Sequence, residues 1–282
     1  MFTLNCKGRI LVIDKPIVMG IINVTPDSFY SESRKSESTE VLNQAEQMVL
    51  EGAAIIDIGG QSTRPGTESV GVEEELKRVI PAIEMLSKYF SDAIISIDTY
   101  HSKVARQAVE AGASIINDIS GGSLDDQMFD TVGKLHVPYI CMHIKGTPQT
   151  MQKYAEYENV SLEVLDYFIK KMDECRLAGI NDVIIDPGFG FAKTIQHNFE
   201  LLNKLEVFKI LERPLLVGIS RKSTIYKTLG STADEALNGT TVLNTAALLK
   251  GANILRVHDV KEAMEAIKLV DAIQQPTYES QK

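Results

Sequence analysis

Short apolar runs alternate with stretches of helical spacing along nearly the whole sequence, at a loose period of roughly 30 residues. The runs are rich in β-branched residues and nearly continuous, which is typical of strands covered on both faces. Eight such runs are present: Ile17–Ile22, Ala54–Ile58, Ile94–Ile97, Ser114–Ile116, Pro138–Met142, Asp182–Ile185, Pro214–Val217 and Asn253–Val257. Between them, apolar residues recur three and four positions apart, as at Leu162, Leu165 and Ile169. Eight strand–helix alternations with no strand left over predict an α/β fold, a closed (β/α)8 TIM barrel rather than an open doubly wound sheet.

The chain is expected to form one barrel with two short ends. Its 282 residues would suit two average domains, but single α/β barrels of about 200–250 residues are common, and the sequence contains no interdomain linker. We therefore expect a barrel domain over residues 17–275. Residues 1–16 fit a short N-terminal β-hairpin, with strands Phe2–Asn5 and Arg9–Ile13, that would close the bottom of the barrel. Residues 276–282 are expected to form a C-terminal tail.

The composition excludes several classes of protein. The net charge is −9, so no overall attraction to nucleic acid or to an anionic membrane is expected. The apolar runs fall well short of the ~18 residues that span a bilayer, and Asp14 interrupts the first apolar stretch before a secretory signal could form. Three cysteines without a CxxC motif (Cys6, Cys141 and Cys175) provide neither a disulfide framework nor a zinc site. We therefore expect a protein of the reducing cytoplasm.

Every predicted strand ends in a polar residue. In chain order these residues are Asn23, Asp57, Asp98, Asn117, His143, Asp186, Lys222 (with Ser220 and Arg221) and Arg256 (with His258). Barrel enzymes carry their chemistry at this end, because the loops that follow the strands gather there above a rigid barrel. A polar residue at one strand end can also simply mark the point where a buried strand reaches water. For any single position this alternative explains the residue as well as a role in a site does. The complete set favours an active site.

Positive side chains gather at the ends of the last two strands, where barrels commonly bind phosphate. Lys222, Arg256 and His258 lie there. Arg64 lies in the loop 59–66, whose glycine, serine and threonine residues let backbone N–H groups approach an anion. Either arginine alone could be an ordinary surface residue. Together these groups predict a local anion site on a protein of negative net charge.

A second group of strand-end residues is acidic or carries an amide. Asp98, Asn117 and Asp186 accept hydrogen bonds, which suits a 2-amino-4-oxo heterocycle whose carbonyl would accept from Lys222. The alternative is that these residues cap helices or pair with arginines. Asn23 is a candidate Mg²⁺ ligand, because Mg²⁺ takes few protein ligands and bridges phosphate oxygens. The polar loop after it is expected to act as a lid.

The strand-end motifs resemble those of the dihydropteroate synthase family across nearly the whole chain. The matching segments are NVTPDSF (23–29), GGQSTRPG (59–66), SIDT (96–99), NDISG (117–121), CMHIKGTPQTMQ (141–152), DPGFGF (186–191), GISRKS (218–223) and RVHDV (256–260). Eight motifs in the family's order, each at a predicted strand end, make a highly specific match. One departure is that Tyr30-Ser31-Glu32-Ser33 stands where the family has Ser-Asp-Gly-Gly, so Glu32 would have to replace a loop aspartate.

The resemblance implies a transferase of folate biosynthesis that is a target of sulfonamides. It would join 6-hydroxymethyl-7,8-dihydropterin diphosphate to p-aminobenzoate by an SN1-like mechanism, giving 7,8-dihydropteroate and pyrophosphate. The implied pterin site comprises Asp98, Asn117, Asp186, Lys222, Met142, Phe191 and Gly218. The implied diphosphate site comprises Asn23, Thr63, Arg64, Arg256 and His258, with Mg²⁺ as cofactor on Asn23. The implied p-aminobenzoate site comprises Phe29, Thr63, Pro65, Ser220, Arg221 and Lys222. The implied catalytic residues are Arg64, Lys222, Arg256, His258 and Asp27.

Chemistry supports this interpretation. A CH₂–O bond next to an electron-rich pterin can ionise if the charge of the leaving diphosphate is neutralised, and a neutral arylamine needs no strong general base. The family also implies a homodimer, and the late helical segments around 241–249 and 264–273 carry apolar residues that such an interface could use.

Three other functions remain as alternatives. A methyltetrahydrofolate–corrinoid-type methyltransferase would share the pterin residues but would not need the diphosphate site at Arg64 and Arg256. A metal-dependent aldolase would need clustered ligands that the sequence lacks. A catalytically inactive pterin-binding protein would bind pterin without turnover. No P-loop, HExxH or GxSxG motif indicates another chemistry.

Overall fold

The computed structural model describes residues 1–24, 34–61 and 70–274, and all eight predicted barrel strands are present in these parts. Their ends coincide with the predicted ends or differ from them by one or two residues. The strands are β3 (Ile17–Asn23), β4 (Ile55–Gly59), β5 (Ile94–Asp98), β6 (Ile115–Asp118), β7 (Tyr139–Met142), β8 (Val183–Asp186), β9 (Leu216–Val217) and β10 (Ile254–Val257). They pair in parallel in the order β8-β7-β6-β5-β4-β3-β10-β9, and an isolated bridge between Ile185 and Leu215 joins β8 to β9. The sheet is therefore a nearly closed barrel, as predicted.

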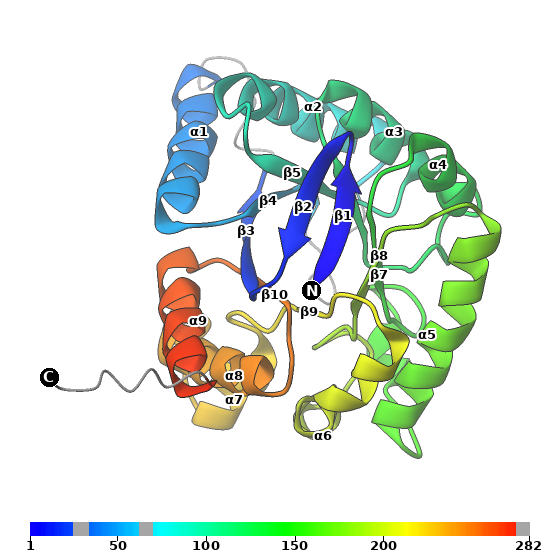
Figure 1. Ribbon diagram of the computed structural model, residues 1–282, viewed down its shortest axis with the longest axis vertical. Coiled ribbons are helices and arrows are strands. Elements are labelled where there is room, and N and C mark those ends of the chain that lie inside the picture. Colours follow the sequence, from blue (N-terminus) through cyan, green and yellow to red (C-terminus); the bar gives the residue numbers. More distant parts are fainter. Residues whose placement is uncertain (25–33, 62–69, 275–282) are drawn as a thin grey trace, which may run out of the picture.

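Helices surround the strands in a ring (Figure 1). They are α1 (Arg34–Glu51), α2 (Val72–Tyr89), α3 (Ser102–Ala111), α4 (Met128–Leu135), α5 (Val160–Leu177), α6 (Ile195–Asn203), α7 (Ser223–Leu229), α8 (Leu237–Leu249) and α9 (Val260–Gln274), with short 3₁₀ helices η2 (Met151–Tyr154) and η3 (Leu205–Leu211). The main core lies between these helices and the outward side chains of the strands, such as Ile56 and Ile58 of β4. No helix in the described parts of the chain is long and apolar enough to cross a bilayer.

The N-terminal hairpin closes one end of the barrel, as predicted. It consists of β1 (Phe2–Cys6) and β2 (Arg9–Ile13), which pair antiparallel and lie over the centre of the strands in Figure 1. Its apolar side chains, among them Leu4 and Ile13, pack against the inward side chains at the N-terminal ends of the barrel strands. One end of the barrel is thereby filled with hydrocarbon, so the polar strand ends at the opposite end are left for a site. The proposed tail 276–282 lies outside the described residues.

Glu75, in the first turn of α2, is fully buried, and neither of its carboxylate oxygens has a hydrogen-bond partner among the residues that the structure describes. Burial raises the pKa of Glu75 to about 8. In the unfolded chain this carboxyl group ionises near its ordinary pKa of about 4.3. Between these two values the folded protein therefore binds the proton more tightly than the unfolded chain does. The stability associated with Glu75 is complete below the lower value and is lost as the pH rises towards the higher one.

We therefore expect Glu75→Gln to flatten the pH dependence of stability between about pH 5 and pH 8 and to stabilise the protein at pH 8. Chemical denaturation at several pH values measures this difference. Glu84→Gln, at an exposed position on the same helix, serves as the control and should leave the pH dependence unchanged. A Glu75→Gln variant whose stability falls with pH as steeply as that of the parent would contradict the prediction.

Candidate active site

Four residues at or next to the C-terminal ends of their strands occupy one level of the barrel. In the register of the parallel pairs, Asn23 of β3 is the partner of Gly59, Gly59 is the partner of Asp98 of β5, and Asp98 is the partner of Asn117 of β6. A Cβ atom placed on Gly59 would lie 3.6 Å from Oδ1 of Asn23 and 3.8 Å from Oδ2 of Asp98. The glycine thus leaves a gap between the amide and the carboxylate. Asp186 pairs in the same way with Met142 of β7.

Arg256 of β10 joins two buried carboxylates inside this rim. Its Nε atom donates to Oδ2 of Asp57 at 2.7 Å, and its terminal nitrogen donates to Oδ2 of Asp98 at 2.6 Å. The side-chain amide of Asn117 donates to the same oxygen of Asp57 at 3.0 Å. Arg256, predicted for the diphosphate site, therefore bonds directly to Asp98 and is linked through Asp57 to Asn117, and both of these residues are predicted for the pterin site.

Asp57 belongs to the site, although the sequence alone predicts no role for it. It lies in β4 between Ile56 and Ile58, which face the helices, so it faces the barrel interior like Ile55. It is fully buried, and only one of its carboxylate oxygens has a hydrogen-bond partner among the described residues. A buried carboxylate needs a cationic partner, so an inward aspartate in an otherwise apolar strand was a signal that could have identified it.

Lys222, the N-cap residue of α7, reaches the same space from β9. Its ammonium group donates to the carbonyl oxygen of Phe189 at 2.6 Å and lies 4.7 Å from the ring centroid of Phe191. A Cβ atom on Gly218 would lie 3.9 Å from Nζ of Lys222 and 3.8 Å from Cβ of Arg256. Gly218 therefore leaves space between the two cations. Phe191 and Met142 belong to one buried apolar cluster at this end of the barrel.

Burial shifts the protonation of the charged groups in this site. It raises the pKa of Asp98 to about 7, although the neighbouring Arg256 lowers that pKa. Burial also raises the pKa of Asp186, which Lys222 lowers in turn. The pKa of Lys222 falls to about 8 through burial and is raised by Asp186. The site thus holds two carboxyl groups and an amine that exchange protons closer to neutrality than usual, which is typical of an active site.

The loops after β9 and β10 place Ser220 and His258 together. The hydroxyl oxygen of Ser220 lies 3.1 Å from Nδ1 of His258 and accepts a hydrogen bond from the backbone N–H of His258 at 3.3 Å. The imidazole of His258 is exposed. A diphosphate approaching Arg256 would therefore meet a histidine two residues further along the chain.

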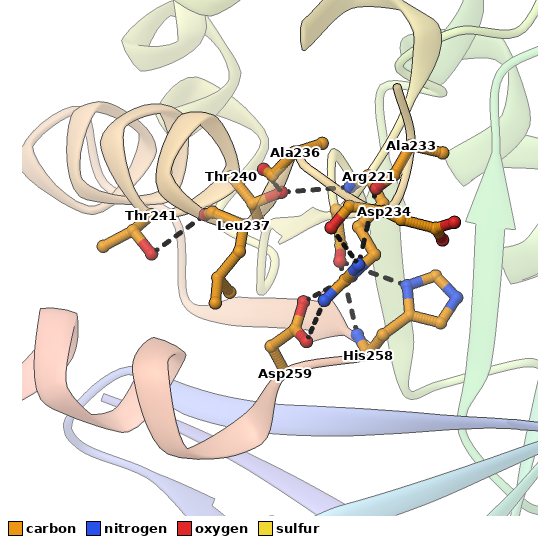
Figure 2. Close-up of polar contacts among 10 residues, drawn as sticks. Arg221, Ala233, Asp234, Ala236, Leu237, Thr240, Thr241, His258 and Asp259 are labelled. Carbon is orange, nitrogen blue, oxygen red and sulfur yellow. Dashed lines mark hydrogen bonds and ion pairs between the residues drawn. The ribbon is translucent and has the colours of Figure 1, made fainter. Parts of the chain in front are cut away.

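Arg221 turns away from this space. Figure 2 shows its guanidinium group directed at the carboxylate of Asp259, to which it donates from Nε at 2.8 Å and from a terminal nitrogen at 2.7 Å. The guanidinium also donates to the carbonyl oxygens of Ala233 and Asp234, and the backbone N–H of Arg221 donates to the hydroxyl of Thr240 at 3.1 Å. Its contact with p-aminobenzoate stays a prediction, and in this structure the guanidinium holds the loop before α8 onto the start of α9.

Five predicted site residues lie outside the described residues: Asp27, Phe29, Thr63, Arg64 and Pro65. Among the residues that are described, no three His, Cys, Asp or Glu side chains are grouped so that they could hold a metal ion. Asn23 is exposed at the end of β3. A single exposed amide oxygen fits Mg²⁺, which takes few protein ligands and completes its shell with water and substrate phosphate.

The chain is similar to known proteins over nearly its whole length. The family model for pterin-binding enzymes matches residues 19–258. The dihydropteroate synthase of Escherichia coli (strain K12) is 43% identical over 271 residues, which cover 95% of this chain and 95% of that protein. Among solved structures, the Yersinia pestis dihydropteroate synthase in a sulfonamide drug complex superposes with a TM-score of 0.90, at 38% identity over 97% of this chain and 99% of that chain. The Xanthomonas albilineans dihydropteroate synthase with 4-aminobenzoic acid gives a TM-score of 0.89, at 38% identity over 96% of this chain and 98% of that chain. The chain therefore belongs to the pterin-binding enzyme family and, within it, to the dihydropteroate synthases.

Proposed function

We propose that this chain transfers the 7,8-dihydropterin-6-ylmethyl group from its diphosphate ester to the amine of p-aminobenzoate, giving 7,8-dihydropteroate and pyrophosphate in folate biosynthesis. The observation that carries the proposal is the buried network at the strand ends, in which Arg256 bridges Asp57 and Asp98 next to Lys222. Such a set can accept from the N–H groups of a pterin and donate to its carbonyl. The relatives that carry this activity cover nearly the whole chain.

In the proposed complex the pterin lies among Asp98, Asn117, Asp186 and Lys222. The carboxylates and the amide accept from its amino and ring N–H groups, and Lys222 donates to its carbonyl oxygen. Met142 and Phe191 contact the faces of the ring, and Gly218 places no side chain beside Lys222 and Arg256. Arg256 has five N–H donors, so it can keep a carboxylate partner while it also donates to the diphosphate.

The reaction begins when the CH₂–O bond breaks and the bonding electrons leave with the diphosphate. Arg256 and His258, together with Thr63 and Arg64, would hold the departing oxygens, and the pterin ring delocalises the cation that remains. The Mg²⁺ ion that we propose on Asn23 would supply further positive charge to the diphosphate. The amine nitrogen of p-aminobenzoate then bonds to the methylene carbon and releases a proton. This SN1-like course needs no nucleophilic side chain. Asp27 is proposed to assist from the first loop.

The second substrate would bind at the rim, next to the methylene group of the pterin. We propose that Ser220, Arg221 and Lys222 contact it together with Phe29, Thr63 and Pro65. The Xanthomonas albilineans structure with 4-aminobenzoic acid and the Yersinia pestis structure with a sulfonamide support a common site for the substrate and for sulfonamides that resemble it. Sulfonamides would then compete with p-aminobenzoate in this chain.

The experiment that tests the function is a coupled assay for pyrophosphate release. Release should require both the pterin diphosphate and p-aminobenzoate, and it should fall when Mg²⁺ is chelated. Tight pterin binding without release would instead support a catalytically inactive pterin-binding protein. Methyl transfer to a corrinoid without any need for the diphosphate would support a methyltransferase.

Arg256→Lys should weaken binding of the diphosphate ester although the positive charge is kept. A lysine can replace neither the planar fork nor the simultaneous bonds to Asp57 and Asp98. We expect the affinity for the pterin diphosphate to fall by roughly ten- to a hundredfold, since a charge-assisted hydrogen bond contributes about 1.5–3 kcal/mol. Calorimetric titration with the ester and with the pterin alcohol separates the diphosphate contribution from the pterin contribution.

The matched control for this variant is Arg176→Lys, which keeps the charge of a surface arginine on α5. It should bind the ester as the parent does. The diphosphate role of Arg256 would be refuted if Arg256→Lys lost affinity for the alcohol and for the ester by the same factor.

We further propose that the chain acts as a homodimer in the cytoplasm. Apolar side chains on α8 and α9 are exposed, namely Val242, Leu249, Leu269 and Ile273, and they would be covered by a second copy. The three cysteines are free and buried, which suits a reducing compartment.

A further inference from the structure

A second buried lysine, Lys193, lies behind the pterin site and has no part in the mechanism above. It follows the turn between β8 and α6, and only 3% of its surface is exposed. Lysine is almost never buried to this extent unless it is paired. Its amine lies 3.0 Å from the carbonyl oxygen of Gly188, 3.1 Å from that of Phe191 and 2.9 Å from Nδ1 of His143. His143 follows the last residue of β7, and Gly188 and Phe191 lie in the turn after β8.

The three contacts of Lys193 can be satisfied in either protonation state. As an ammonium group it has three N–H donors for three acceptors. Burial lowers the pKa of Lys193 to about 7, and burial together with Lys193 lowers the pKa of His143 far below its usual range. As a neutral amine, Lys193 would donate to the two carbonyls and accept from Nδ1–H of His143. The contact geometry therefore does not depend on a particular charge.

The turn that Lys193 holds has an unusual backbone. Ala192 has a φ of +48°, in the left-handed region that non-glycine residues adopt only when their surroundings enforce it. Gly188 also has a positive φ, and a Cβ atom there would overlap the carbonyl oxygen of His143. The turn is thus pressed against the end of β7, and a strained turn of this kind needs added contacts to stay in one conformation.

The same turn carries two groups of the pterin site. The ring of Phe191 contributes to the apolar cluster with Met142, and the carbonyl oxygen of Phe189 accepts from Lys222. Lys193 holds the carbonyls of Gly188 and Phe191 on either side of Phe189 in the sequence. Asp186, another pterin residue, accepts from the N–H of Gly188 at 2.8 Å. A shift of the turn would therefore move the ring of Phe191, the carbonyl oxygen of Phe189 and the N–H of Gly188 that Asp186 accepts from.

We propose that Lys193 is a positioning residue of the pterin site, which fixes the turn 188–191 to His143 and so orients Phe191 and Lys222. The assignment rests on the proposed function for its binding and kinetic readouts, and the hydrogen-exchange readout does not depend on that function. It predicts an effect on pterin binding from a side chain that does not touch the pterin.

The test compares Lys193→Met, which keeps the aliphatic stem and removes every donor, with Lys204→Met, which makes the same change at an exposed lysine just after α6. With Lys193→Met, we expect the dissociation constant of the pterin diphosphate to rise by about tenfold or more, equivalent to about 1.4 kcal/mol. The KM for p-aminobenzoate at saturating pterin diphosphate should change little. Lys204→Met should match the parent in both constants.

A folded Lys193→Met variant with the parent's pterin affinity would overturn the assignment, because a purely structural lysine would change thermal stability alone. If Lys193→Met does not fold, Lys193→Gln retains donors for one or both carbonyls and should show a smaller loss of affinity. Amide hydrogen exchange of this variant should rise in residues 188–193 and stay unchanged in β8. Unchanged exchange in the turn would also refute the role. A parent protein that releases no pyrophosphate would refute the proposed function and leave this exchange test intact.

Discussion

Lys222→Ala should lower kcat/KM by about 10²–10³-fold, the loss that follows removal of one preorganised donor from an active site. The amine of Lys222 lies between the carbonyl oxygen of Phe189, the ring of Phe191 and the carboxylate of Asp186, with which it interacts electrostatically. Without it the pterin carbonyl has no cationic donor, and Asp186 loses the charge that holds its pKa down. The variant should therefore bind pterin weakly and also react slowly once pterin is bound. Single-turnover pyrophosphate release at saturating substrate separates the two effects.

Lys227→Ala is the matched control for this prediction, because Lys227 lies on the same helix, α7, and is exposed. It should retain the parent's rate. The assigned role of Lys222 would fail if Lys222→Ala kept a rate within about threefold of the parent, a difference of only about 0.6 kcal/mol.

Asp57→Asn should destabilise the protein by about 3 kcal/mol, as is usual when one partner of a buried ion pair is removed. Asp57 accepts from Arg256 and from Asn117 through the same oxygen. An amide oxygen at the same place can still accept both bonds, but the side chain is neutral, so Arg256 loses one of its two carboxylate partners and keeps Asp98. We expect the melting temperature to fall by roughly 6–12 °C, since 1 kcal/mol corresponds to about 2–4 °C in a chain approaching this size. Pterin and diphosphate affinities should fall together, because Asp57 orients residues of both sites.

Differential scanning calorimetry and titration with the pterin diphosphate measure the two parts of this prediction. Asp130→Asn removes a carboxylate from an exposed ion pair with Lys134 on α4, and it should change stability by less than about 1 kcal/mol. If the melting temperature of Asp57→Asn were as close to that of the parent as the melting temperature of Asp130→Asn, the hydrogen bonds around Arg256 would not contribute to stability as predicted.

Much of the fold could be predicted because a buried strand appears in the sequence as a short run of apolar residues. The eight β-branched runs became β3 to β10, since a strand covered by helices outside and by side chains inside must be apolar on both faces. Strand ends were less certain, as at β9, which begins at Leu216 rather than at Pro214. Pro214 lacks the N–H that a strand ladder requires, and the N–H of Leu215 donates to the side chain of Asn253 at 2.9 Å rather than to the backbone of a neighbouring strand.

The candidate site was predictable in part for a similar reason. Asp98 and Asp186 end their strands and Asn117 is the second-last residue of β6, and parallel strands bring their C-terminal ends to one rim. No role was predicted for Asp57, because its role depends on the bond to Arg256, which is 199 positions away in the sequence. No role was predicted for Lys193 for the same reason. A lysine after a turn is expected to be exposed, and only the structure shows that this one is buried against three hydrogen-bond partners. The bond from the guanidinium of Arg221 to Asp259 could not be predicted either, because the two residues are 38 positions apart, and the contact of Arg221 with p-aminobenzoate stays a prediction.

The sequence by itself determined the barrel, its hairpin, the set of polar strand ends and the family to which they belong, because periodicity, motif order and residue chemistry are all written along the chain. Only the tertiary structure decided which of these polar groups bond to one another. Partnerships such as Arg256 with Asp57, or Lys193 with His143, arise when the barrel closes and water is removed from the groups inside it. Burial makes these hydrogen bonds and ion pairs stronger than they would be in water. Because burial depends on residues from distant parts of the chain, it cannot be predicted from any one segment of the sequence.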